Sequence, residues 1–142
     1  MAEYEATCGM PADSVVVFGV ASDLTLVNRW LPHGLWVRGS GPDRVEAGGE
    51  VVPGDGVHEG LFRVQDDQLR VEWGGRDHPE YAGWLQVADS ASGTSEVTVH
   101  ISLLDEPEEE SSPERAAQVR GMLDESLSRL RDEVGDRLTN SG

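Results

Sequence analysis

The segment from Pro113 to Leu138 reads PERAAQVRGMLDESLSRLRDEVGDRL and predicts one long amphipathic α-helix. Its apolar residues recur every three or four positions, so they fall along a single stripe of a helix. The stripe comprises Ala116, Val119, Leu123, Leu127, Leu130, Val134 and Leu138. At about 1.5 Å per residue the helix is about 40 Å long, which is the span of a small domain. We therefore expect the rest of the chain to form the surface that covers this stripe.

The polar residues around the same segment also favour a helix. Ser111 and Glu114 form a capping-box pattern, and Pro113 falls in the first turn, where its missing N–H costs nothing. Two pairs of opposite charge stand four positions apart, which stabilises a helix by about 0.2–0.5 kcal/mol per pair. These pairs are Glu125 with Arg129 and Glu133 with Arg137.

The composition favours one domain that does not bind nucleic acid. At 142 residues the chain suits a single domain spanning 1–142, with room for a core and an internal cavity. Eleven basic against 27 acidic residues give a formal net charge of −16, which disfavours polyphosphate partners. The first residues lack the basic and apolar regions of an export signal, and no apolar run is long enough to cross a membrane. We therefore expect a cytoplasmic protein without membrane insertion.

Upstream of the long helix, the pattern predicts one strand, two short helices and about six further strands. The first strand is indicated by apolar residues that alternate with polar ones: Tyr4, Ala6, Cys8 and Met10. Asp13 and Asp23 are the expected N-caps of the two short helices. From Gly34 to Leu104, short β-rich runs alternate with clusters of Gly, Pro and Asp, which indicates an antiparallel meander.

Four strands of this meander are clearly marked, at 57–65, 69–74, 82–88 and 96–104, and shorter runs between Leu35 and Val52 supply the others. Residues 105–112 form an acidic connector that we expect to be a solvated loop before the helix at 113–138. A long helix laid across a twisted antiparallel sheet closes it on one side. Where helix and sheet diverge, we expect an apolar pocket that takes a small molecule.

The segment ADSVVVFGVASD at 12–23, followed by Trp30-Leu31-Pro32, resembles the N-terminal signature of the START-like helix-grip superfamily. This group includes polyketide cyclases, birch-pollen-allergen relatives and lipid-transfer domains. Asp23 and Trp30 match the acidic residue that closes the first small helix and the Trp near the end of the second. The resemblance implies an α+β helix-grip fold, in which a curved antiparallel sheet wraps around a long C-terminal helix, with two short helices after strand one.

The resemblance also implies an internal cavity between the long helix and the sheet. Members of the superfamily use this cavity to carry lipids, to bind hormones or metabolites, or to cyclise polyketides. Some members in actinobacterial clusters protect the producer by binding its own toxic product or by being consumed by it. The resemblance therefore implies a hydrophobic small-molecule ligand and leaves its identity open.

No set of residues predicts a metal site or a nucleotide cofactor. The four His residues are scattered without an i, i+4 pair, and the single Cys8 excludes a thiolate cluster. The Gly residues fall in turns rather than between a strand and a helix, as a phosphate loop would require. We therefore expect neither metal nor cofactor. If the cavity is catalytic, one or two polar groups must shuttle protons, and His100, His58 and Tyr81 are the candidates.

The period of two on the last strand leaves two orientations open for His100. Either the apolar set of Val97, Val99 and Ile101 faces the cavity, or the set with Thr98 and His100 does. An inward His100 would contact a ligand hydroxyl or carbonyl, or act as an acid–base group. An outward His100 would lie on the solvated face of the sheet, and this is the orientation that we expect.

Four tryptophans in the chain each bring about 150–250 Å² of surface that must be covered. Core packing is the expected role of any one of them. Together with other apolar residues they also offer flat walls for a polycyclic or aromatic ligand. The predicted ligand-binding residues are Trp30, Trp36, Phe62, Trp73, Trp84, Val119, Leu123 and Leu127.

Three functions remain open. The first is binding of a lipid- or polyketide-like metabolite in the cavity, for sequestration or self-resistance in a secondary-metabolite pathway. It is favoured because no convergent acid, base and oxyanion donors can be named. The second is a polyketide cyclase or dehydratase, whose cavity folds the chain while polar groups move protons. The third is an interaction module whose acidic surface docks on a basic protein. The sequence leaves the oligomeric state open, and a monomer is our expectation.

Overall fold

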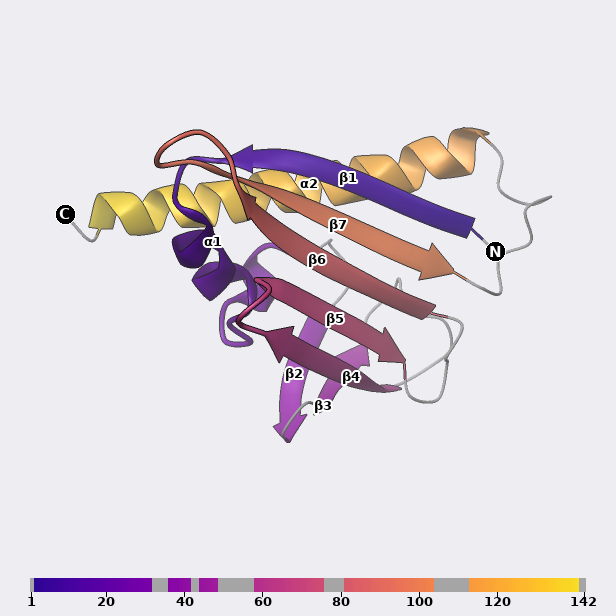
Figure 1. Cartoon of the computed structure of the whole chain (residues 1–142). Helices are drawn as coiled ribbons and strands as arrows, with labels where there is room; N and C mark the ends of the chain where they lie inside the picture. The colour runs from indigo at the N-terminus through magenta and orange to yellow at the C-terminus, as the bar shows by residue number, and fades with distance from the viewer. Residues whose placement is uncertain are drawn as a thin grey trace.

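A seven-stranded antiparallel sheet packs against a long C-terminal helix in the computed structural model (Figure 1). The structure describes residues 2–31, 36–41, 44–48, 58–75, 81–103 and 113–140. Its elements, in chain order, are β1 (Ala2–Met10), α1 (Ser14–Ala21), η1 (Val27–Arg29), β2 (Trp36–Gly41), β3 (Arg44–Gly48), β4 (His58–Gln65), β5 (Arg70–Gly75), β6 (Tyr81–Asp89), β7 (Ser95–Leu103) and α2 (Pro113–Asn140). The strand order is β1-β7-β6-β5-β4-β3-β2, so a meander from β2 to β7 is completed by β1 at its edge. This is the predicted α+β helix-grip fold.

The long helix begins where the sequence predicts and runs slightly further, from Pro113 to Asn140. The middle of its apolar stripe is buried, from Leu123 to Val134, whereas Leu138 is 42% exposed. Including Leu138 in the buried stripe was wrong, because the C-terminal end of α2 extends past the sheet (Figure 1). Of the two predicted ion pairs, Glu125 with Arg129 is confirmed at 2.9 Å. Glu133 instead approaches Arg29 of η1, at 3.6 Å.

The two short helices differ from each other in type. The first is the α-helix α1, as predicted, although Asp13 forms no side-chain capping bond and the Ser14 N–H donates to Asp89 of β6. The second is the short 3-10 helix η1, so two short helices follow the first strand as predicted. Asp23 caps this segment as predicted, because its carboxylate accepts hydrogen bonds from the N–H and O–H of Thr25 and its carbonyl accepts one from the Val27 N–H at 3.1 Å.

The strands follow the predicted meander closely. The four clearly marked runs correspond to β4, β5, β6 and β7, and the less regular region before them contains β2 and β3. The turn between β6 and β7 requires glycine, since Gly93 has a φ of 77°. The acidic connector at 105–112, including the predicted cap Ser111, lies outside the described residues.

Antiparallel pairing aligns the side chains of neighbouring strands in rows across the sheet. One row on the face toward α2, here called the Trp73 row, comprises Tyr4, Ile101, Gly83, Trp73 and Phe62. The next row comprises Ala6, Val99, Leu85, Val71 and Val64. Both rows belong to the inner face, because most of their members pack in or against the same apolar cluster as Leu123, Leu127, Leu130 and Val134 of α2.

Candidate functional site

The inner face is covered more completely near α1 than in the Trp73 row. Near α1, the side chains of Leu85, Val87 and Val97 are at most 2% exposed. In the Trp73 row, by contrast, Ile101, Trp73 and Phe62 are only half-buried. The covered end therefore forms the core, and the Trp73 row marks the end where apolar surface remains accessible.

The long helix repeats this gradient along its own length. Leu127 and Leu130 are at most 1% exposed, whereas Ala116 and Val119, nearer its N-terminus, are only half-buried. The N-terminal half of α2 lies over the same end of the sheet as the start of β1 and the end of β7 (Figure 1). Half-covered apolar side chains of the helix and of the sheet thus occur at one end of the molecule, and we call this end the interior site.

Phe62 and Trp73 form the sheet side of the interior site. They are direct partners on β4 and β5 and lie on the same face. The Trp73 indole extends over Gly83 of β6, since a Cβ placed on Gly83 would lie 2.6 Å from Cε2 and Nε1 of the ring. None of the residues of the Trp73 row is charged, so this surface suits an apolar ligand. On the helix side, Val119 is the predicted residue that remains half-buried, whereas Leu123 and Leu127 are 4% and 1% exposed within the core.

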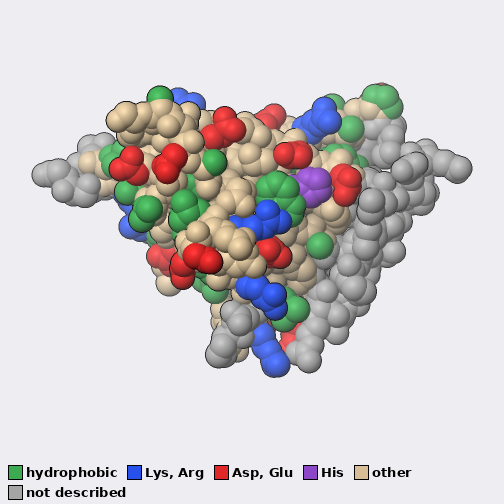
Figure 2. Space-filling model, in the orientation of Figure 1, with side chains coloured by type: hydrophobic (Ala, Val, Ile, Leu, Met, Phe, Trp, Pro, Cys, Tyr) green, Lys and Arg blue, Asp and Glu red, His purple; other side chains and the backbone are tan. Residues whose placement is uncertain are grey.

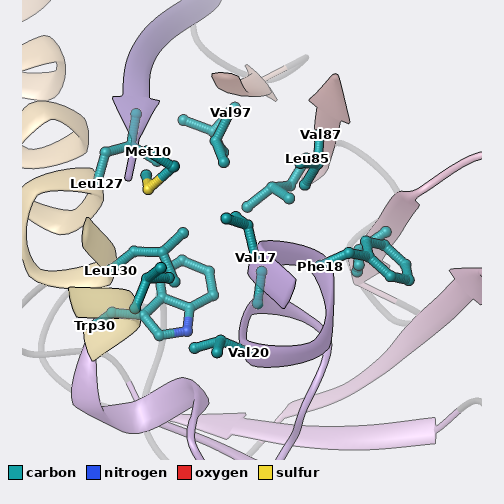
Figure 3. Packing of buried hydrophobic residues seen from close by; sticks show 14 of the residues in the cluster. Met10, Val17, Phe18, Val20, Trp30, Leu85, Val87, Val97, Leu127 and Leu130 are labelled. Carbon is teal, nitrogen blue, oxygen red and sulfur yellow. The ribbon is translucent and has the colours of Figure 1, made fainter. Parts of the chain in front are cut away.

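Trp30 is a core residue rather than a wall of the interior site. It is 6% exposed and lies beside Leu130, Val17 and Val20 (Figure 3). Its indole N–H is buried and has no hydrogen-bond partner within the described part of the chain. The backbone carbonyl of Trp30 accepts a 2.6 Å hydrogen bond from Ser126 of α2, which ties the segment after η1 to the long helix.

Trp36 lies neither in the core nor in the interior site, but on β2, the last strand of the sheet. Strand alternation puts it on the opposite face from Val37, and its ring covers Gly48 of β3, where a Cβ would lie 2.6 Å from the indole. The Arg38 guanidinium lies 5.5 Å from the centre of the ring. Trp36 also lines an open surface groove of about 630 Å³ between η1 and β2, whose other lining residues are Leu24, Thr25, Asn28, Val37, Arg38 and Gly39.

Trp84 and His100 lie on the outer face of the sheet, away from α2. Their rings stack with 5.3 Å between centroids and 8° between planes, and the Arg70 guanidinium lies 4.5 Å from the Trp84 ring on the same face. Glu3 and Glu5 of β1 approach the imidazole at 3.7 and 3.5 Å. Figure 2 looks onto this face, where the imidazole (purple) lies among acidic and basic side chains.

This placement decides the orientation of His100 that the sequence left open. The apolar set of the last strand, with Val97 0% and Val99 6% exposed, faces the core, so His100 faces outward as expected. It also corrects the prediction for Trp84, which does not contribute to a wall beneath the helix. The reason is register, since Trp84 pairs with His100 across β6 and β7 and paired residues share a face.

Of the three predicted acid–base candidates, the structure describes the side chain of His100 alone. His100 is on the outer face, and the side chains of His58 and Tyr81 lie outside those that the structure describes, although both residues belong to strands. Across the described residues, no three His, Cys, Asp or Glu side chains are grouped so that they could hold a metal ion. In the same part of the chain, no helix is long and apolar enough to span a membrane.

Sequence reasoning missed Gly83 and Asn28. Gly83 is a glycine inside a predicted strand, a position that often marks the close approach of another group, and this signal was present in the sequence. Asn28 hydrogen bonds through its side chain to the backbone of Val37. No local pattern indicates this contact, because it joins η1 to β2, nine positions further along the chain.

Comparison with known proteins adds a family and a fold. The family model described as polyketide cyclase / dehydrase and lipid transport matches residues 1–135. A START superfamily protein from Mycobacterium smegmatis has a TM-score of 0.71 at 14% identity, covering 94% of this chain and 97% of that one. The Zhui aromatase/cyclase from a Streptomyces species has a TM-score of 0.71 at 11% identity, covering 99% and 98%. A Thermus thermophilus protein has a TM-score of 0.71 at 18% identity, covering 99% and 100%. At these identities the structural similarity concerns the fold alone, and the comparison with curated proteins found no match.

Proposed function

Because the chain belongs to the polyketide cyclase / dehydrase and lipid transport family, we propose that it binds a hydrophobic metabolite in its interior site and carries or sequesters it. One observation supports this proposal above all others. Ile101, Trp73 and Phe62 of the Trp73 row are only half-buried, and so are Ala116 and Val119 near the N-terminus of α2, although all five pack against the inner apolar cluster. Apolar surface that stays accessible on a folded protein is a usual property of a binding site.

The energetics of burial agree with a ligand of this kind. Each Å² of apolar surface removed from water contributes about 25 cal/mol, so a ligand that covers Phe62, Trp73 and Val119 gains mainly from desolvation. The net charge of −16 disfavours an anionic headgroup as the main determinant of binding. A neutral, largely apolar metabolite suits both observations.

Catalysis is the alternative that the family description also allows. A cyclase needs proton-transfer groups within reach of its substrate. His100 does not meet this need, because it stacks on Trp84 on the outer face. Without His100 in reach of the interior site, we propose a carrier or sequestering protein first and keep a cyclase or dehydratase as the second candidate.

The proposal is tested by titrating the purified protein with apolar metabolites and following tryptophan fluorescence and heat of binding. Saturable binding with about one ligand per chain is expected, together with a rise in melting temperature that grows with ligand concentration. Incubation of a poly-β-keto substrate mimic with the wild type is expected to yield no cyclised product above the uncatalysed rate. Absence of saturable binding to every member of the panel would contradict the proposal, and turnover would favour the cyclase.

A further inference from the structure

Gly83 is the one position of the Trp73 row that has no side chain. It is buried in β6 between Ile101 of β7 and Trp73 of β5, its partners in the ladder. Glycine weakens a strand interior and often marks a close approach by another group. Here that group is the Trp73 indole. The gap in the row is therefore filled by a ring that reaches across from the neighbouring strand.

Several atoms of the Trp73 ring, and not a single one, lie close to Gly83. A Cβ on Gly83 would lie 2.6 Å from Cε2, 2.6 Å from Nε1 and 2.7 Å from Cζ2 of Trp73. Three adjacent ring atoms at nearly equal distance mean that this Cβ would point into the indole. Real Cβ atoms do not come this close to ring carbons. The backbone of β6 thus supports one side of the indole, and the ring remains half-buried, with part of its surface accessible.

From this geometry we infer that Gly83 positions the Trp73 indole as a flat platform, and that the interior site consequently prefers planar ring systems to flexible acyl chains. The inference rests on the proposed function, that the interior site takes an apolar small molecule. A flat, supported aromatic surface contacts a planar ligand over its whole area and gains the added attraction of offset stacking. A flexible chain loses more conformational freedom when it lies on the same surface, and it gains no stacking.

The chain contains a matched control for this inference. Gly48 and Trp36 repeat the arrangement at the other end of the sheet, where a Cβ on Gly48 would lie 2.6 Å from Cζ2 of Trp36. Trp36 belongs to the opposite face of β2 from Val37 and is not part of the Trp73 row. Gly48→Ala therefore displaces a tryptophan to a similar degree without altering the interior site. A second control is Gly9→Ala in β1, because a Cβ there meets nothing within 4 Å.

The experiment compares two probes in the four proteins: wild type, Gly83→Ala, Gly48→Ala and Gly9→Ala. The probes are emodin, a planar anthraquinone, and cis-parinaric acid, a fluorescent fatty acid. We expect the wild type to bind emodin more tightly than cis-parinaric acid. We expect Gly83→Ala to raise the Kd for emodin about tenfold and to leave the Kd for cis-parinaric acid within about threefold. Gly48→Ala and Gly9→Ala are expected to leave both constants within about twofold.

Circular dichroism melts of each variant establish that it is folded before titration. If Gly83→Ala does not fold, Trp73→Leu replaces it, because leucine keeps apolar bulk and lacks a flat ring. The same selective loss of emodin binding is then expected. The inference is overturned, while the proposed function stands, if Gly83→Ala weakens both probes equally or weakens emodin no more than Gly48→Ala does. If the wild type binds neither probe, both the inference and the proposed function fail.

Discussion

The side-chain amide of Asn28 forms two hydrogen bonds with the backbone of Val37. Its Nδ2 donates to the Val37 carbonyl at 2.9 Å, and its Oδ1 accepts from the Val37 N–H at 2.8 Å. Since β2 is the last strand in the sheet order, these backbone groups have no neighbouring strand among the residues that the structure describes. Asn28 therefore takes the place of a further strand at Val37. Unpaired strand edges can pair with strands of other chains, and the contact with Asn28 blocks such pairing at Val37.

Replacing Asn28 by alanine is expected to lower the free energy of unfolding by about 1–2 kcal/mol, since two hydrogen bonds are lost. Urea denaturation measures this loss, and amide hydrogen exchange should show faster exchange at Val37. Asn28→Asp keeps the acceptor for the Val37 N–H but places a carboxylate oxygen against the Val37 carbonyl, so it should lower the free energy of unfolding as well. An unchanged exchange rate at Val37 in the alanine variant would show that the contact does not protect the edge.

The stack of His100 on Trp84 is expected to affect stability and not ligand binding. Both rings lie on the outer face, and the imidazole is near Glu3 and Glu5 of the edge strand β1. His100→Ala should lower the free energy of unfolding by about 0.5–1.5 kcal/mol through loss of the ring contact. Its affinity for an apolar ligand should stay within about twofold of wild type. A large loss of affinity would contradict an outward role for His100.

Ser126 is expected to matter more than its neighbour Ser128, although both belong to α2. The Ser126 hydroxyl is buried and donates to the carbonyl of Trp30 at 2.6 Å, whereas Ser128 is exposed. Ser126→Ala leaves a buried carbonyl unpaired, which costs about 1–3 kcal/mol. Ser128→Ala should be neutral or slightly stabilising, because alanine is the better helix former. Thermal denaturation of the two variants makes the comparison, and equal effects would mean that the Ser126 hydrogen bond contributes nothing.

Gly121→Ala is expected to stabilise the protein. Gly121 lies on the exposed side of α2, and a Cβ at this position meets nothing within 4 Å. Alanine is favoured over glycine in a helix interior by about 1 kcal/mol, so the melting temperature should rise. Differential scanning calorimetry gives the sign directly. A fall in melting temperature would mean that this glycine makes a contact in solution that its open surroundings do not indicate.

The hydrogen bonds between Asp23 and Thr25 predict that part of the stability of the protein depends on pH. The Thr25 hydroxyl, and to a lesser extent the Thr25 N–H, donate hydrogen bonds to the Asp23 carboxylate and hold its pKa below the usual value. A carboxyl group whose pKa is lowered by folding adds stability above its unfolded pKa and loses this contribution as the pH falls through its folded pKa. Thr25→Val should therefore raise the pKa of Asp23, as measured by NMR titration.

The same variant provides a stability test. The difference in unfolding free energy between wild type and Thr25→Val should be largest near neutral pH and should shrink as the pH falls through the acidic range in which Asp23 titrates. In an Asp23→Asn background, the effect of Thr25→Val should no longer depend on pH in this range. A pH-dependent difference that persists without the carboxylate would assign the effect to another group.

Sequence reasoning succeeded wherever a single periodicity was enough. The stripe from Leu123 to Val134 specifies both the long helix and its buried side, because a helix with a period of 3.6 residues places these positions on one face. Alternation on β7 limited His100 to two orientations, and the apolar set was the one that could be buried. It failed for Trp84, because the face on which this residue lies depends on the register of β6 against β7, which the apolar pattern does not show.

Composition, hydrophobic periodicity and a short N-terminal signature were sufficient to determine the helix-grip architecture of this chain, because each depends on residues close together in sequence. Only the tertiary structure decided how the four tryptophans divide: Trp30 into the core, Trp73 to the interior site, Trp84 to the outer face and Trp36 to the free edge of β2. The physical reason is strand register. Which residues become neighbours across the sheet depends on pairing between segments far apart in the chain, and a shift by one residue would exchange the two faces.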